Sequence, residues 1–113
     1  MLYMQSFNIK EGRMKDFQKW IKENEGMMQK HAPKGWTYGG THAYVLGFGR
    51  YHAATIWQCS KYGDFDAWRE HDDATWNRLG EEWSNFALPD AGEAVLLREM
   101  SDTIIMEAKK PKK

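Results

Sequence analysis

Hydrophobic residues recur along the chain with two different periods, and the changes of period mark the expected elements. Alternate positions are apolar over residues 2–9, which predicts a strand. Apolar positions over residues 13–31 are spaced by three and four, which predicts an amphipathic helix. Residues 36–46 and 51–59 predict two more strands, joined as a hairpin across a glycine-containing turn at 47–50.

The clearest helical stripe lies in the second half of the chain. It starts just after Asp64, which is expected to cap the helix, and ends before Pro89. Because Gly80 costs about 1 kcal/mol relative to alanine in a helix, we expect any kink to fall there. This helical stripe consists of Phe65, Trp68, Asp72, Trp76, Leu79, Trp83 and Phe86.

Residues 93–100 predict a last strand, which the apolar run at 103–106 would continue after a break.

The order β-α-β-β-α-β predicts an α+β protein with the ferredoxin-like plan, in which two helices cover one face of an antiparallel sheet. The pair Gly39–Gly40 inside a strand predicts a bulge or a close backbone approach. The strand over 51–59 is apolar on both parities, although a strand with one solvated face should alternate. We therefore expect a homodimer, in which a second subunit covers the face that the helices leave bare.

Composition and charge narrow the class of protein. The 113 residues fit one domain, expected over 1–108, followed by a basic disordered tail at 109–113. Sixteen basic residues balance sixteen acidic ones, which argues against nucleic acid or an anionic membrane as a partner. One cysteine excludes a disulfide framework and favours a cytoplasmic location, and neither a signal peptide nor a membrane-length apolar run is expected.

Two segments resemble a known group of proteins. The opening YMQSFNIKEGRM at 3–14, followed by Phe17, resembles the first strand and helix start of the dimeric α+β barrel superfamily. It is most similar to the NIPSNAP-like and antibiotic-biosynthesis-monooxygenase-like branches. The segments TIWQC at 55–59 and FDAW at 65–68 resemble the third strand and second helix start of the same group. The resemblance spans about residues 2–100 and implies a homodimer with a pocket between sheet and helices in each subunit.

Members of this superfamily include cofactor-free monooxygenases, lyases and haem-degrading enzymes, and the last group can be checked residue by residue. The resemblance matches the haem-degrading pattern at Asn8 and Trp68. The position of the haem-ligating histidine falls at Arg78, and arginine does not ligate iron as imidazole does. His71 is too early to replace it in the same geometry. We therefore expect neither haem degradation nor a cofactor.

Polar residues within the apolar stripes are the candidates for chemistry. Asp72 and Asn24 sit mid-stripe on the two helices, while Ser6 and Asn8 share a parity on the first strand. If these groups meet in a cavity lined by Trp and Met, they form a typical small-molecule site. The ligand-binding set predicted on this basis is Ser6, Asn8, Phe17, Ile21, Asn24, Met28, Trp68, Asp72 and Trp76.

Asp72 is the candidate acid or base, because burial raises the pKa of a carboxyl group. Structural alternatives stay open for each polar candidate. Asp72 can pair with an arginine, Asn24 can bond a loop, and Asn8 can cap a turn. His42 and His52 would face the same side only in one register of the hairpin, and no metal site is expected.

Three functions follow from this reasoning. The favoured one is binding of a small apolar molecule, either like an acyl chain or planar and aromatic, in the pocket between sheet and helices. The second is a cofactor-free monooxygenase or lyase that uses Asp72 as acid or base. The third is a structural dimer without a ligand, in which the apolar stripes are solid core.

Overall fold

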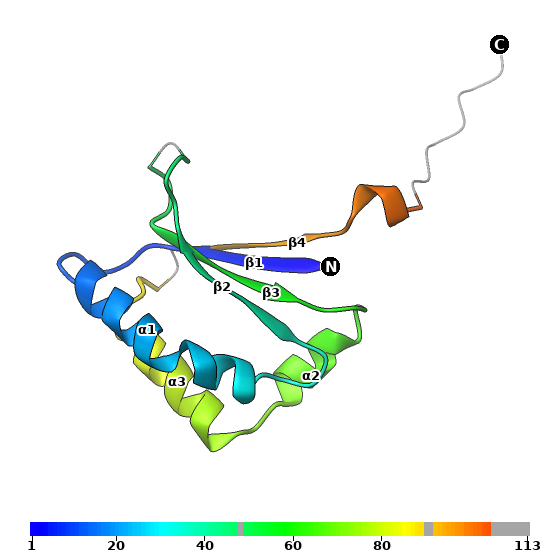
Figure 1. Cartoon of the computed structure of the whole chain (residues 1–113), viewed down its shortest axis with the longest axis horizontal. Helices are drawn as coiled ribbons and strands as arrows, with labels where there is room; N and C mark the ends of the chain where they lie inside the picture. The colour runs from blue at the N-terminus through cyan, green and yellow to red at the C-terminus, as the bar shows by residue number, and fades with distance from the viewer. Residues whose placement is uncertain (48, 90–91, 105–113) are drawn as a thin grey trace, which may run out of the picture.

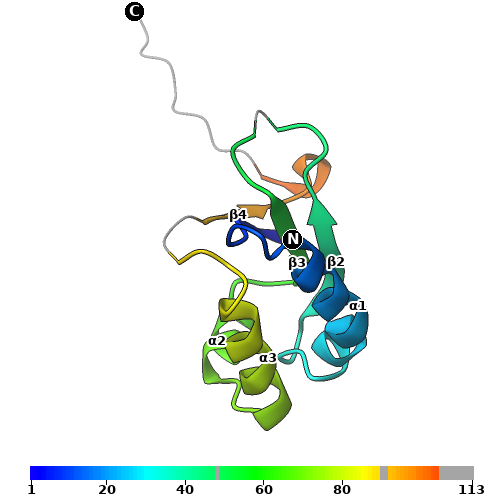
Figure 2. The same ribbon diagram turned by 90° about the vertical axis from the view of Figure 1, so that its left-hand side faces the viewer.

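Four strands form one antiparallel sheet in the order β2-β3-β1-β4. We analysed a computed structural model, which describes residues 1–47, 49–89 and 92–104. Three α-helices lie on one face of the sheet (Figures 1 and 2). This is the predicted ferredoxin-like α+β plan. The strands are β1 (Leu2–Phe7), β2 (Thr37–Ala43), β3 (Ala53–Gln58) and β4 (Glu93–Leu97), and the helices are α1 (Met14–Lys30), α2 (Asp64–Glu70) and α3 (Ala74–Ser84).

The second predicted helix is two helices, and this corrects the expectation of one helix with a kink at Gly80. The chain leaves the helical conformation at His71 and re-enters it after Asp73, both of which have extended backbones. Asp73 starts α3 as its N-cap, because its side chain accepts a 2.8 Å hydrogen bond from the Trp76 backbone N–H. Asp64, which was predicted to cap its helix, is instead the first residue of α2, and Gly63 is the N-cap.

The outer elements are shorter than their apolar runs predicted. The strand β2 ends at Ala43, and β3 begins at Ala53. A longer connection therefore replaces the tight hairpin turn that the sequence predicted at 47–50. The last strand stops at Leu97, and a short 3-10 helix, η1 (Met100–Asp102), follows it. Thr103 and Ile104 are not in a strand, whereas residues 105–108 and the predicted tail at 109–113 lie outside the described residues.

The predicted bulge is present in β2. The register against β3 shifts between Tyr38 and Thr41, which are separated by Gly39–Gly40. Gly40 has a φ of +96°, a conformation that glycine adopts without strain. A Cβ at Gly39 would lie 3.0 Å from the carbonyl oxygen of Ile56. The glycine pair is therefore required by the backbone at this point.

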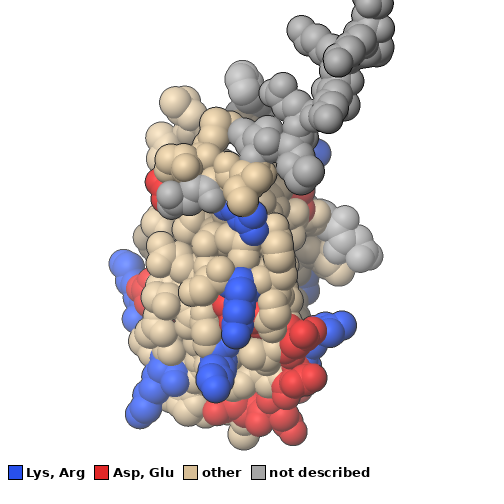
Figure 3. Space-filling view, turned by 90° about the vertical axis from the view of Figure 1, so that its right-hand side faces the viewer, with Lys and Arg blue, Asp and Glu red and all other residues tan. Residues whose placement is uncertain are grey.

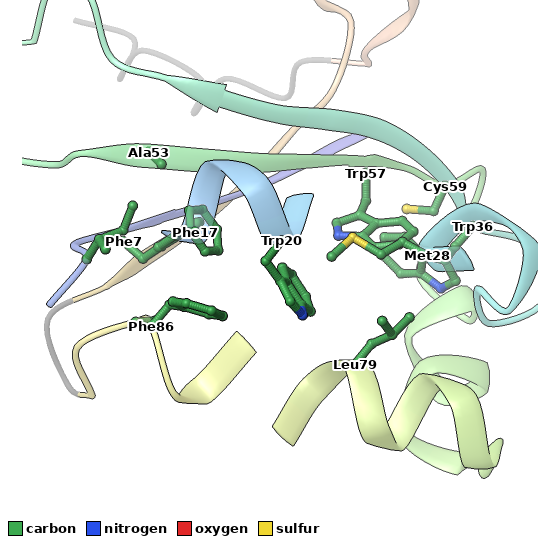
Figure 4. Close-up of a cluster of buried hydrophobic side chains, with 12 residues drawn as sticks. Phe7, Phe17, Trp20, Met28, Trp36, Ala53, Trp57, Cys59, Leu79 and Phe86 are labelled. Carbon is green, nitrogen blue, oxygen red and sulfur yellow. The ribbon is translucent and has the colours of Figure 1, made fainter. Parts of the chain in front are cut away.

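The core lies between the sheet and the helices and is largely aromatic (Figure 4). At one end Phe7 packs edge-on against Phe17, with ring centroids 5.6 Å apart. Trp20 lies near the middle, and its indole N–H donates a 2.9 Å hydrogen bond to Glu82 of α3. That hydrogen bond lowers the pKa of the Glu82 carboxyl group. Cys59 is a buried core residue as predicted, and burial raises the pKa of its thiol.

The opposite face of the sheet is apolar and carries no helix among the described residues. The pairing registers place Met4, Ile56 and Val95 on this face, next to Leu2 and Leu97. Leu2 and Leu97 are 39% and 50% exposed. The β2–β3 connection rises on the same side, away from the helices (Figure 1). This open face is where the sequence analysis expects a second subunit.

Candidate functional site

A cavity of about 190 Å³ lies between the sheet and the helices. Its floor comes from β1 and β3, and its walls come from all three helices and the strand residue Trp57. Trp57 and Leu79 are buried, whereas Trp68, Trp76 and Trp83 are partly exposed, so solvent reaches the cavity from the α2–α3 side. The lining residues are Gln5, Met28, Thr55, Trp57, Trp68, Trp76, Leu79, Gly80 and Trp83.

Two polar side chains stand on the floor of this cavity. Gln5 of β1 is paired directly with Thr55 of β3, so both side chains project from the helix-covered face of the sheet. Thr55 is 7% exposed, and its hydroxyl lies 3.2 Å from that of Thr41. No charged residue is among the lining residues that the structure describes. The site is therefore neutral, with one amide and one hydroxyl in an apolar surround.

The walls are tryptophan rings in edge-to-face contact. The ring centroids of Trp57 and Trp68 lie 5.1 Å apart, those of Trp57 and Trp76 5.5 Å, and those of Trp68 and Trp76 5.3 Å. Such packing holds each ring at a fixed angle to its neighbours. The cavity thus offers rigid aromatic surfaces to a ligand.

Known proteins are similar to this chain in structure and not detectably in sequence. No family model matches the chain, and no curated protein matches it. An uncharacterized NIPSNAP domain protein from Burkholderia xenovorans has a TM-score of 0.69 at 16% identity, over 92% of this chain and 98% of that one. The fold of this chain is therefore similar to that of a NIPSNAP domain, as the resemblance in sequence predicted.

Two further solved structures are similar over nearly the whole chain. An uncharacterized NIPSNAP-like domain protein from Burkholderia xenovorans has a TM-score of 0.69 at 10% identity, covering 94% of this chain and 90% of that one. HapK from Hahella chejuensis has a TM-score of 0.60 at 13% identity, covering 95% and 100%. At these sequence identities the similar structures support the fold alone, and any function has to be argued from the residues of the site.

Three of the sequence-predicted site residues meet in the cavity. Met28 comes from α1, Trp68 from α2 and Trp76 from α3, although they are far apart in sequence. Phe17 and Ile21 do not reach it. Phe17 is buried against Phe7. Phe17 and Ile21 line a separate groove between α1 and β2.

Asp72 lies outside the cavity, which corrects its prediction as a buried acid or base. It is exposed in the break between α2 and α3, and its carboxylate accepts a 3.0 Å hydrogen bond from Asn77. The prediction assumed one continuous helix, and the break at 71–73 turns Asp72 toward solvent. The neighbouring Asp73 is the structural residue: it contacts Nδ1 of His31 at 3.0 Å, and this hydrogen bond lowers the Asp73 pKa.

Asn24 and Ser6 are also not cavity residues. The Asn24 side chain donates a 2.8 Å hydrogen bond to the carbonyl of Trp20, one turn earlier in α1. Ser6 projects from the open face of the sheet, where its hydroxyl lies 2.6 Å from that of Tyr44. Side-chain parity on β1 decides this, because Ser6 and Gln5 must point to opposite faces.

Asn8 has the turn-capping role that the sequence left open. Its amide donates to the carbonyl of Arg50 at 3.2 Å and accepts from the backbone N–H of His52 at 3.0 Å. These bonds hold the β2–β3 connection against the end of β1. The His52 Nδ1 accepts from the Ile9 N–H, and His42 contacts the carbonyl of Gly39. Within the described ranges, no three His, Cys, Asp or Glu residues gather to hold a metal ion.

The sequence reasoning missed the two polar residues on the cavity floor. Gln5 lies between Tyr3 and Phe7 on the apolar parity of β1, and Thr55 lies between Ala53 and Trp57 on that of β3. The candidates predicted on the first strand, Ser6 and Asn8, have the opposite parity to Gln5. Polar residues within the apolar parity of each strand, taken with period two, identify both Gln5 and Thr55. In the described part of the chain, no helix is long and apolar enough to span a membrane.

Proposed function

We propose that the cavity binds a small, planar, uncharged aromatic molecule. The observation that carries this proposal is the combination of tryptophan walls with a floor whose only polar groups, among the described residues, are Gln5 and Thr55. An apolar cavity of about 150 Å³ accepts benzene. A cavity of about 190 Å³ that opens to solvent has room for one or two fused rings.

The lining of the cavity favours a ring system over an acyl chain. A planar ring can pack edge-to-face or offset-stacked against tryptophan rings. A long acyl chain would need more space than a cavity of about 190 Å³ provides. Because Asp72 lies outside the cavity, the catalytic alternative loses the residue on which it rested, and we assign binding without a reaction step.

Gly80 provides a direct test, because it lines the cavity from the middle of α3. A Cβ built at Gly80 meets no atom within 4 Å, so the first side-chain atom fits without a clash at a position that lines the cavity. Gly26 of α1 is the matched control, since a Cβ there also meets no atom within 4 Å and it does not line the cavity. Both substitutions to leucine raise helix propensity.

The experiment is isothermal titration of 2-naphthol into wild type, Gly80→Leu and Gly26→Leu. We expect saturable binding to wild type and to Gly26→Leu, with affinity at least tenfold lower in Gly80→Leu. Equal affinities in all three proteins would place the ligand elsewhere and contradict the proposal, as would the absence of binding to wild type.

We also propose that a second copy of this chain covers the open face of the sheet. That face is apolar around Ile56, and the β2–β3 connection beside it carries Val45 and Leu46, which are 93% and 90% exposed. Ile104, beyond η1, is 89% exposed. Figure 3 views the molecule from the side, with the open face at its top; most charged side chains in this view lie in the lower half, and acidic ones gather at the lower right. Exposed apolar surface of this extent is typical of an interface.

A further inference from the structure

Three hydroxyl groups form a chain that ends on the cavity floor. The Tyr38 hydroxyl lies 2.6 Å from Oγ1 of Thr41, and that oxygen lies 3.2 Å from Oγ1 of Thr55. Tyr38 and Thr41 belong to β2, and Thr55 belongs to β3 and lines the cavity. The chain therefore connects a polar group beside α1 with the ligand site.

The bulge in β2 makes this chain possible. Residues three apart on a regular strand point to opposite faces of the sheet. The register shift between Tyr38 and Thr41 places both on the face that bears the helices: Tyr38 is paired with Trp57 and Thr41 with Thr55. Bulges commonly re-aim side chains in this way next to binding sites.

A carboxylate beside the outer end of the chain favours one direction of its hydrogen bonds. The Glu25 carboxylate lies beside the Tyr38 hydroxyl, and an ionised carboxylate can only accept hydrogen bonds. Burial, with a further contribution from Glu25, raises the pKa of Tyr38 to about 12, so this hydroxyl keeps its proton at neutral pH.

Each hydroxyl has one proton to donate, so the direction propagates along the chain. Either hydroxyl of each pair can be the donor; with the Tyr38 hydroxyl turned toward Glu25, Thr41 donates to Tyr38 and Thr55 donates to Thr41. The Thr55 oxygen then has only its lone pairs left for the cavity. A ligand group that meets Thr55 must itself be a donor.

We propose that Thr55 selects ligands that carry a hydroxyl on the aromatic ring, a phenol or an enol, by accepting a hydrogen bond from that hydroxyl. Gln5, directly opposite Thr55, completes the site because its amide N–H can donate to the same ligand oxygen. This inference rests on the proposed aromatic-binding function and names the chemical class of its ligand. Thr55 is then a specificity residue, with Thr41 and Tyr38 as positioning residues.

The test compares 2-naphthol, 2-methoxynaphthalene and naphthalene by isothermal titration. The methoxy compound keeps the ring and the oxygen acceptor and lacks the donor. We expect wild type to bind 2-naphthol about tenfold more tightly than 2-methoxynaphthalene, the effect of one net hydrogen bond. Thr55→Val should abolish this difference, and Thr55→Ser, which keeps the hydroxyl, should retain it.

Thr41→Val tests the direction of the chain. Without Thr41 as acceptor, the Thr55 hydroxyl is free to donate into the cavity, so binding of 2-methoxynaphthalene should improve relative to 2-naphthol. Tyr51→Phe is the control, because it removes a hydroxyl that is bonded to Glu93 away from the cavity, and it should leave the ratio unchanged.

The outcomes separate the two proposals. Equal binding of 2-naphthol and 2-methoxynaphthalene to wild type would overturn the role of Thr55 while leaving the aromatic site in place. A difference that survives in Thr55→Val would also overturn it. Failure of all three compounds to bind wild type would overturn the proposed function, and this inference with it.

Discussion

The hydroxyls of Tyr38 and Thr41 lie 2.6 Å apart, although the two residues are three positions apart on one strand. A regular strand would separate them across the sheet. The Gly39–Gly40 bulge brings them to the same face and in line with Thr55. The bulge in the backbone of β2 therefore supplies the hydrogen-bond partner of Thr55, a polar residue on the cavity floor.

Substitution of Gly40 should uncouple this arrangement. At a φ of +96° the side chain of alanine is strained, and its Cβ would lie 3.0 Å from Nε2 of His42. We expect Gly40→Ala to cost about 1–3 kcal/mol of stability and to reduce the preference for 2-naphthol over 2-methoxynaphthalene. Thermal unfolding and isothermal titration measure the two effects.

Gly12→Ala is the matched control for this prediction. Gly12 also has a positive φ, of +77°, but a Cβ there meets no atom within 4 Å and the residue lies away from the cavity. It should lower stability without changing the ligand preference. A Gly40→Ala protein that is as stable as wild type and keeps the preference would show that the bulge does not depend on glycine.

Asp73 should make stability depend on pH in the acid range. Its hydrogen bonds with His31 and with the Trp76 N–H lower the Asp73 pKa in the folded state. A carboxyl group whose pKa is lowered in the folded state stabilises the fold at pH values above its ordinary pKa of about 3.9. This stabilisation is lost as the pH falls through the lower pKa of the folded state. Asp73→Ala should therefore lower the melting temperature at pH 7 and narrow the gap to wild type near pH 2.

Asp72→Ala serves as the neighbouring control. Asp72 is exposed, and its side chain accepts a hydrogen bond from Asn77. Its removal should change the melting temperature far less than Asp73→Ala and should leave 2-naphthol binding intact. A large loss of binding in Asp72→Ala would restore the site predicted from sequence and contradict the placement of this carboxylate.

A charge on the open face of the sheet should break the proposed dimer. Ile56 lies on β3 on the side away from the helices, and a buried unpaired lysine is costly at an interface. We expect wild type to sediment as a dimer and Ile56→Lys as a folded monomer in analytical ultracentrifugation. Lys22→Glu, on the exposed side of α1, should remain dimeric. A monomeric wild type at micromolar concentration would contradict the proposal.

Much of the fold was predictable because it follows from periodicity. The stripe around Phe17 and Met28 predicted α1, and the alternation around Tyr3 and Phe7 predicted β1. The Gly39–Gly40 pair predicted the bulge. Each of these signals is local, since side-chain direction repeats every two residues in a strand and every 3.6 in a helix.

The candidate site was less predictable, because one local error moved its central residue. The spacing from Trp68 through Trp76 fits an unbroken helix and fits equally well two helices separated at 71–73. The capping bond from Trp76 to Asp73 and the contact of Asp73 with His31 favour the break. His31 lies at the end of α1, so the deciding contact joins residues that are distant in sequence.

The sequence by itself determined the order of the four strands, the helix α1, the apolar faces and the site of the bulge, because these depend on local periodicity and on backbone sterics. Only the tertiary structure decided which polar residues share a cavity. Gln5 and Thr55 meet through strand register, and Trp68 and Trp76 reach them through the packing of α2 and α3. Register and packing are set by contacts between segments that are distant in sequence. The periodicity of one segment does not specify which other segment it pairs with or in which register.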